Sequence, residues 1–231
     1  MVPTTNNVQA RPSSLVTGAF IGAGAATALA GAVLAFGIQP ATDLSVDFWR
    51  YPWSSGGAFV AFSIFSAVLH GLVVVGLVAF GRNGAAGRSR AATSGVALAV
   101  AGTALLLVGE LASIPIRDAQ VDDTSAGIVA AVFGVAGFAS MIGFLLAGRA
   151  TLRAGVWHGW RRFTPLAPGI WLLILTPVTL AAPTLLHGGV GVYGLCLLAI
   201  AIALHTEPTV AVHSDPVAAG IPGVEPRLER A

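Results

Sequence analysis

Six runs of apolar residues divide the chain, and each run is long enough to be considered as a membrane-crossing helix. They cover residues 15–38, 58–80, 91–114, 127–148, 168–186 and 188–204. The first four hold 22 to 24 residues, which is about 33 to 36 Å of α-helix. The last two hold 19 and 17 residues and are joined only by His187. The pattern predicts an all-α, polytopic transmembrane helical bundle with six spans; four spans followed by a re-entrant hairpin is the alternative.

The composition excludes a water-soluble domain. Of the 231 residues, 55% are hydrophobic and only 10% are charged, and the mean hydropathy is +0.83. A soluble surface needs roughly a quarter of all residues charged. The single cysteine, Cys196, excludes a disulfide within one chain.

The arginines predict the orientation of the bundle. With the N-terminus inside the cell, ten of the 12 arginines fall on the inner side, and only Arg50 and Arg117 fall on the outer side. This asymmetry matches the positive-inside rule and requires an even number of crossings. We therefore expect a plasma-membrane protein with a cytoplasmic segment at 1–14, a six-helix domain at 15–204 and a disordered cytoplasmic tail at 205–231.

Four polar side chains inside the apolar runs form a candidate intramembrane site. His70 is expected near the bilayer midplane, where an ionisable group is costly and normally faces the bundle. Ser63 and Ser66 precede it by seven and four residues and share its helix face. A proton relay or ligand contact is one interpretation of His70; a neutral imidazole that is hydrogen-bonded to a neighbouring helix is the other.

Glu110 is the fourth member of this candidate site. Counted from the outer boundary of its run, it is expected about 12 Å from His70 along the membrane normal, too far for a direct hydrogen bond. A structural pairing with His187 or Arg50 near the outer surface is one expectation. A role in ion or proton passage is the alternative.

Two further groups of residues indicate packing and lipid contact. Gly18 and Gly22 form a GxxxG pattern, which predicts close helix packing within the chain or, alternatively, homodimerisation. A basic link with interleaved tryptophans is expected to reach anionic headgroups at the cytoplasmic face. Its arginines are Arg149, Arg153, Arg161 and Arg162.

No motif for catalysis, cofactor binding or metal binding is present in the sequence. The five histidines do not give a pair at compatible depth for a haem clamp, and the outer aspartates lack metal-ligand spacing. We predict no catalytic, cofactor-binding or metal-binding residues and no nucleic-acid partner. The expected partners are the lipid bilayer and, through small-residue helix faces, a second copy of the chain or another protein.

Two stretches resemble segments of an uncharacterised family of six-helix membrane proteins from actinobacteria. They are GVWHGWRRFTPL at residues 155–166, which is followed by an apolar helix with Pro177, and WRYPW at residues 49–53. The absence of lysine fits a high-GC genome of this kind. The resemblance implies an integral membrane protein and carries over no site residues.

Together these patterns predict an accessory or interaction protein of the membrane. The alternative is a small transporter or proton-linked channel that uses the midplane histidine. A transporter predicts a water-reaching cavity lined by His70, whereas a packing role predicts an occluded imidazole.

Overall fold

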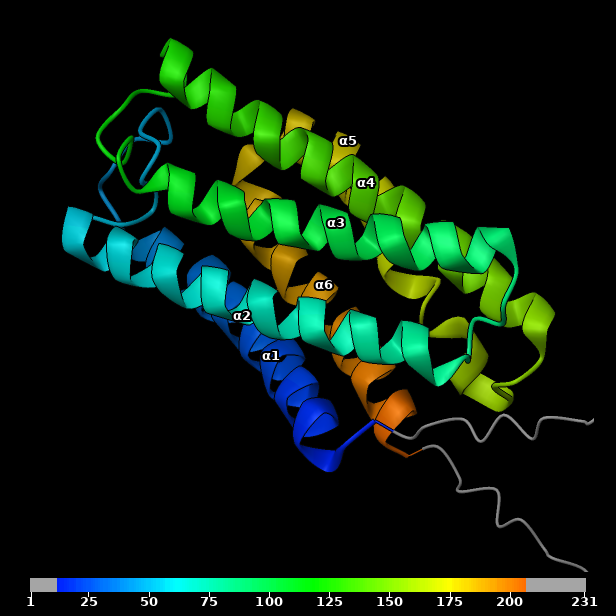
Figure 1. The fold of residues 1–231 in the computed structure, drawn as a ribbon. Coiled ribbons are helices and arrows are strands. Elements are labelled where there is room, and N and C mark those ends of the chain that lie inside the picture. Colours follow the sequence, from blue (N-terminus) through cyan, green and yellow to red (C-terminus); the bar gives the residue numbers. More distant parts are fainter. Residues whose placement is uncertain (1–11, 207–231) are drawn as a thin grey trace, which may run out of the picture.

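The computed structural model describes residues 12–206, which form six α-helices and no β-sheet (Figure 1). The helices are α1 (Ser14–Val33), α2 (Gly56–Asn83), α3 (Arg90–Ser113), α4 (Thr124–Ala154), α5 (Ala167–Ala181) and α6 (Leu186–His205). Helix α1 continues through a π-helical turn at Leu34–Ile38 and a 3-10 turn at Gln39–Ala41. The all-α prediction is confirmed for this part of the chain. The predictions for residues 1–11 and 207–231 lie outside the described residues.

Five of these six helices are long and apolar enough to cross a membrane, which indicates a membrane protein. The exception is α5, whose 15 residues correspond to about 22 Å, less than the thickness of a typical hydrocarbon core. The apolar run at 168–186 is interrupted because Ala182 leaves the helical conformation ahead of Pro183. The residue before a proline is sterically kept out of the helical region.

Local signals set several of the helix ends. The side chains of Ser13, Ser55 and Ser89 each accept a hydrogen bond from the backbone N–H three residues later. These bonds satisfy amides that have no partner within the first helical turn. Gly84 and Gly155 follow α2 and α4 with φ of 83° and 65°, a left-handed conformation that glycine adopts without steric cost.

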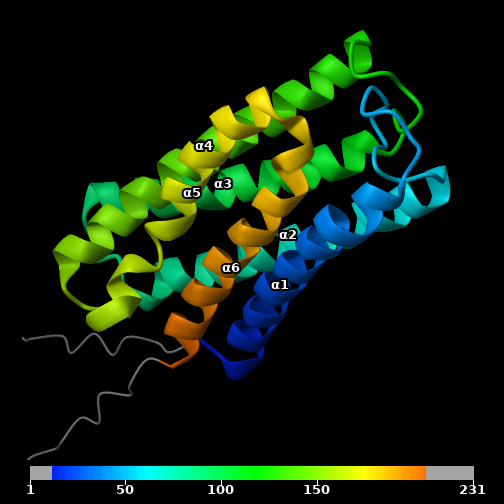
Figure 2. The same cartoon turned by 180° about the vertical axis from the view of Figure 1, so that it is seen from behind.

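Two helix pairs make the closest contacts, α3 with α4 and α1 with α6 (Figures 1 and 2). Between α1 and α6, a Cβ placed on Gly31 would lie 2.4 Å from the backbone nitrogen of Gly191. Between α3 and α4, a Cβ placed on Gly102 would lie 2.5 Å from the backbone nitrogen of Ser140. Glycine is needed at these positions because the neighbouring backbone occupies the space that a methyl group would fill.

The intramolecular packing predicted for Gly18 and Gly22 is not made. A Cβ on either residue would meet nothing within 4 Å, and both residues are exposed on the outer face of α1. The face of α1 that packs on α6 instead carries Gly24 and Gly31, which are buried. The packed glycines are seven residues apart rather than four, and the GxxxG pattern did not reveal which side of the helix meets a neighbour.

The connections separate into two groups at opposite ends of the bundle (Figure 1). The α1–α2 and α3–α4 loops meet at one end. The α2–α3 and α4–α5 connections meet at the other end, where the first residues of α1 and the last residues of α6 also lie. A contact of 3.0 Å between Thr17 Oγ1 and His205 Nδ1 joins these two helix ends.

We expect Gly31→Ala to destabilise the protein and Gly22→Ala to leave its stability unchanged or raised. Both changes remove a helix glycine, but only the first forces a methyl group into the backbone of α6. Overpacking of this kind costs about 1–3 kcal/mol. Thermal unfolding in detergent measures the difference. Equal melting temperatures for the two variants would contradict the α1–α6 contact.

Candidate functional site

Ser63, Ser66 and His70 follow one face of α2, as expected. Ser63 and Ser66 are buried, and His70 is partly accessible. The imidazole lies near the backbone carbonyl of Ser66, but its Nδ1 is buried without a hydrogen-bond partner, as is the Oγ of Ser63. The alternative in which a neighbouring helix supplies a hydrogen bond to Nδ1 is therefore not realised.

Glu110 lies much closer in depth to His70 than the sequence estimate of about 12 Å. A Cβ on Gly71 of α2 would lie 3.6 Å from Leu107 Cδ1 of α3, and this fixes the register of the two antiparallel helices. In this register Glu110 is opposite residue 68, two residues or about 3 Å along the axis from His70. The estimate was wrong because it assumed that the start of α2 and the end of α3 lie at the same depth. In the structure, α2 begins about two and a half turns beyond the level of Ser113, the last residue of α3.

The structural pairing predicted for Glu110 is also not made. Its carboxyl forms no hydrogen bond or ion pair with any residue of the described part. Arg50 binds Asp118 instead, and His187 faces the ring of Tyr51 at 6.5 Å between ring centroids. Arg50 is thus paired within the loops at this end of the bundle, whereas the Nδ1 of His187 is buried without a hydrogen-bond partner.

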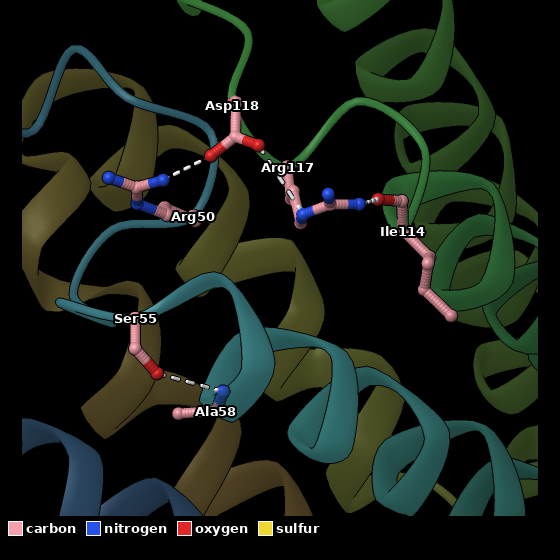
Figure 3. Close-up of polar contacts among 6 residues, drawn as sticks. All are labelled: Arg50, Ser55, Ala58, Ile114, Arg117 and Asp118. Atoms are coloured by element: carbon pink, nitrogen blue, oxygen red, sulfur yellow. Dashed lines mark hydrogen bonds and ion pairs between the residues drawn. The ribbon is translucent and has the colours of Figure 1, made fainter.

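The α1–α2 and α3–α4 loops form a hydrogen-bonded cap over one end of the bundle (Figure 1), and Figure 3 shows its polar side-chain contacts. The backbone N–H of Trp49 donates to the carbonyl of Ala119 at 3.0 Å, and that of Val121 donates to the carbonyl of Asp47 at 2.8 Å. Asp118 accepts from Arg50 and also lies 3.3 Å from Nε of Arg117. One aspartate therefore ties the α1–α2 loop to the end of α3.

Arg117 also closes the end of α3. Its guanidinium donates to the carbonyl of Ile114 at 3.3 Å (Figure 3). The last carbonyls of a helix have no partner within the helix and carry partial negative charge, so a cation is favourable there. The charge pattern of the sequence assigned Arg50 and Arg117 to the same end of the bundle, the end with fewer arginines, where both are found. It did not identify Asp118 as their common partner.

Two open pockets lie at the end of the bundle that carries the cap. The first, of about 510 Å³, is lined by Arg50, Gly56, Gly57, Val60, Arg117 and Asp118. The second, of about 330 Å³, lies between the end of α1 and the α5–α6 turn. Neither pocket is lined by His70, Ser63, Ser66 or Glu110. The candidate intramembrane site opens into neither of them.

The basic link lies at the opposite end. Arg149 and Arg153 are exposed near the end of α4, and Arg162 is exposed in the 3-10 turn Gly159–Phe163. Arg161 is partly buried and donates to the backbone oxygen of Thr206 at 2.9 Å, which fastens the link to the end of α6. Trp157, one of the tryptophans interleaved in the link, does not face outward but is buried against Phe80 with ring centroids 5.5 Å apart.

Sequence analysis missed a second buried polar group in the bundle. Tyr193 of α6 is 5% exposed, and its hydroxyl faces Thr103 of α3 without forming a hydrogen bond. Ser140 of α4 is fully buried, with its Oγ directed at Gly102 of α3. The only sequence signal for these contacts was that each polar residue interrupts an apolar run.

Comparison with known proteins identifies no relative. No protein-family model, no curated protein and no solved structure matches the chain. Within residues 12–206, no three His, Cys, Asp or Glu side chains are grouped closely enough to hold a metal ion.

We expect the Arg50–Asp118 pair to contribute little to stability. A double-mutant cycle of Arg50→Gln and Asp118→Asn should give a coupling energy of about 0.2–1 kcal/mol, because Asp118 is 58% exposed. The coupling should fall as salt is raised. Chemical unfolding of the four proteins measures it. A coupling above about 2 kcal/mol that resists salt would mean that the cap is shielded from water.

Proposed function

We propose that the chain is a six-span protein of the plasma membrane, with both termini in the cytoplasm, that acts as an accessory or interaction protein. The segregation of charge between the two ends of the bundle carries this proposal. The end that holds both described termini carries seven arginines and no acidic residue within 12–206. The opposite end carries two arginines and five aspartates. By the positive-inside rule, the arginine-rich end is cytoplasmic.

The position of the α5–α6 turn supports six crossings over a re-entrant hairpin. Gln39, at the end of the α1 extension, donates to the backbone oxygen of Thr184 in this turn at 2.8 Å. His205, at the other end of α6, contacts Thr17 near the start of α1. Helix α6 therefore covers the same depth as α1. Helix α5 then crosses as a short span that is completed by the turns on either side of it.

The basic link fits a membrane surface on the cytoplasmic side. Arg149, Arg153 and Arg162 are exposed at the arginine-rich end, where anionic headgroups would lie. Each charge near such a surface contributes on the order of 1 kcal/mol. The link thus anchors the inner ends of α4 and α5.

An interaction role is supported by small-residue faces that no helix within residues 12–206 covers. Gly18 and Gly22 on α1 and Gly134 and Gly137 on α4 each have no neighbouring atom within 4 Å of a built Cβ. Small residues allow close backbone approach by another helix within a bilayer. The transport hypothesis lacks such support, because neither pocket reaches His70.

Side-specific labelling tests the orientation. In a Cys196→Ser background, we expect an impermeant thiol reagent applied to intact cells to label Val121→Cys and not Arg88→Cys, because these residues lie at opposite ends of the bundle. Permeabilised cells should label both. Labelling of both positions in intact cells, or of Arg88→Cys alone, would contradict the proposed topology.

Cross-linking tests the interaction role. In the same background, we expect Gly22→Cys to form membrane cross-links more efficiently than Ile174→Cys, an exposed position on α5 whose neighbours three and four residues away are all large or ring-containing. Cross-linked homodimers would identify a second copy as the partner. Equal yields at the two positions would show that lipid covers the Gly18–Gly22 face and would remove the support for an interaction role there.

A further inference from the structure

His70 and Glu110 point into the same part of the bundle interior. Residues seven positions apart in a helix lie on nearly the same face. Ser63 and Leu77, seven positions before and after His70, are 1% and 2% exposed. Thr103, seven positions before Glu110, is fully buried. Both ionisable side chains therefore face neighbouring helices of the bundle.

Two contacts give registers for α2 and α3 that agree to within one residue. Besides the contact of Gly71 with Leu107, a Cβ on Gly81 would lie 2.7 Å from Cγ1 of Val96. The two registers differ by one residue and place His70 and Glu110 about 3 to 5 Å apart along the helix axes. Side chains lean toward the N-terminus of their helix. Because α2 and α3 are antiparallel, the side chains of His70 and Glu110 therefore tilt toward each other along the helix axes.

Three polar side chains on these helix faces carry atoms that lack hydrogen-bond partners within the described part of the protein; Ser63 lies about 10 Å from His70 along the axis, toward the start of α2. Ser63 Oγ and His70 Nδ1 are buried and without a hydrogen bond, and the Glu110 carboxyl makes none. A buried polar group that is left unsatisfied costs about 1–3 kcal/mol. His70 and Glu110 nevertheless keep part of their surface accessible. Unsatisfied polar side chains that stay partly accessible are groups that ordered water can bridge.

No other acidic side chain faces this site from the helices. Glu110 is the sole carboxyl within α1 to α6. Helices α1 and α5 carry no titratable side chain, and α4 carries only Arg149 and Arg153, at its inner end. Helices α2 and α3 add only Arg82 and Arg90, also at the inner end. Helix α6 carries His187, Tyr193, Cys196 and His205.

We propose that His70 and Glu110 face an intramembrane site that holds ordered water, in which the imidazole and the carboxyl together bind one proton; Ser63, two turns nearer the start of α2, extends the same polar face. With one proton shared, the pair carries no net charge, whether the proton is on a carboxyl oxygen or an imidazole nitrogen. Transfer through the water breaks one O–H bond and forms one N–H bond without changing the charge of the site. Burial of a net charge at this depth, which is costly, is thereby avoided. This site is independent of the accessory role.

Nuclear magnetic resonance of the full chain in lipid nanodiscs, with ¹⁵N-labelled histidine, tests the proposal. The spectrum of His70→Gln identifies the signals of His70. We expect Glu110→Gln to shift these signals, because the amide cannot share the proton, and we expect cross-peaks between water and the imidazole. The isosteric change Thr103→Val, on the same face of α3 two turns away, should shift them several-fold less.

Unchanged His187 and His205 signals show that each variant remains folded. His70 signals that move no more in Glu110→Gln than in Thr103→Val would overturn the shared proton. Absence of exchange between water and the imidazole would overturn the hydrated site. If Glu110→Gln does not fold, Glu110→Asp, which retracts the carboxyl by one methylene, replaces it, and the His70 signals must then still move more than in Thr103→Val while the His187 signals stay in place.

Discussion

Close backbone contact between helices is the interaction on which this bundle depends. Inside a bilayer, apolar surface gains little by leaving lipid for protein, so helices associate through packing and polar contacts. Gly31 and Gly191 bring α1 onto α6, and Gly102 brings α3 onto Ser140 of α4. Helix α2 contacts both pairs through α1 and α3. Glycines at a few interior positions therefore set the depth and register of every polar side chain between the helices.

The register between neighbouring helices decides which polar side chains inside the bundle lie at the same depth. Glu110 was expected to pair near the surface with Arg50 or His187, yet Arg50 pairs with Asp118 and His187 lies against the ring of Tyr51 with its Nδ1 unpartnered. The offset between α2 and α3 brings Glu110 to the depth of His70 instead. An ionisable pair without protein partners is consistent with the proposed hydrated, proton-sharing site. The proposed accessory role involves the outward-facing surfaces of the same bundle and does not depend on the proton-sharing site.

The remaining polar contacts of the protein lie at the two ends of the bundle. One end is an ordered cap in which Asp118 links two arginines, and the other is a basic link fastened to α6 by Arg161. Lipid-facing helix surfaces lie between them. This division fits a protein that is oriented by its charges and held at both interfaces by loops, and it leaves the uncovered faces of α1 and α4 free for a partner helix.

The sequence alone determined the helical class, five of the apolar helices and the residues that form the polar face of α2. It could do so because lipid allows few structures other than helices, and a period of 3.6 residues places Ser63, Ser66 and His70 together. Only the tertiary structure decided that Gly24 and Gly31 pack while Gly18 and Gly22 do not, and that Glu110 lies within about 3 to 5 Å of the depth of His70. These features depend on the rotation and sliding of one helix against another. The contacts that fix them join residues far apart in the chain, and no single segment encodes them.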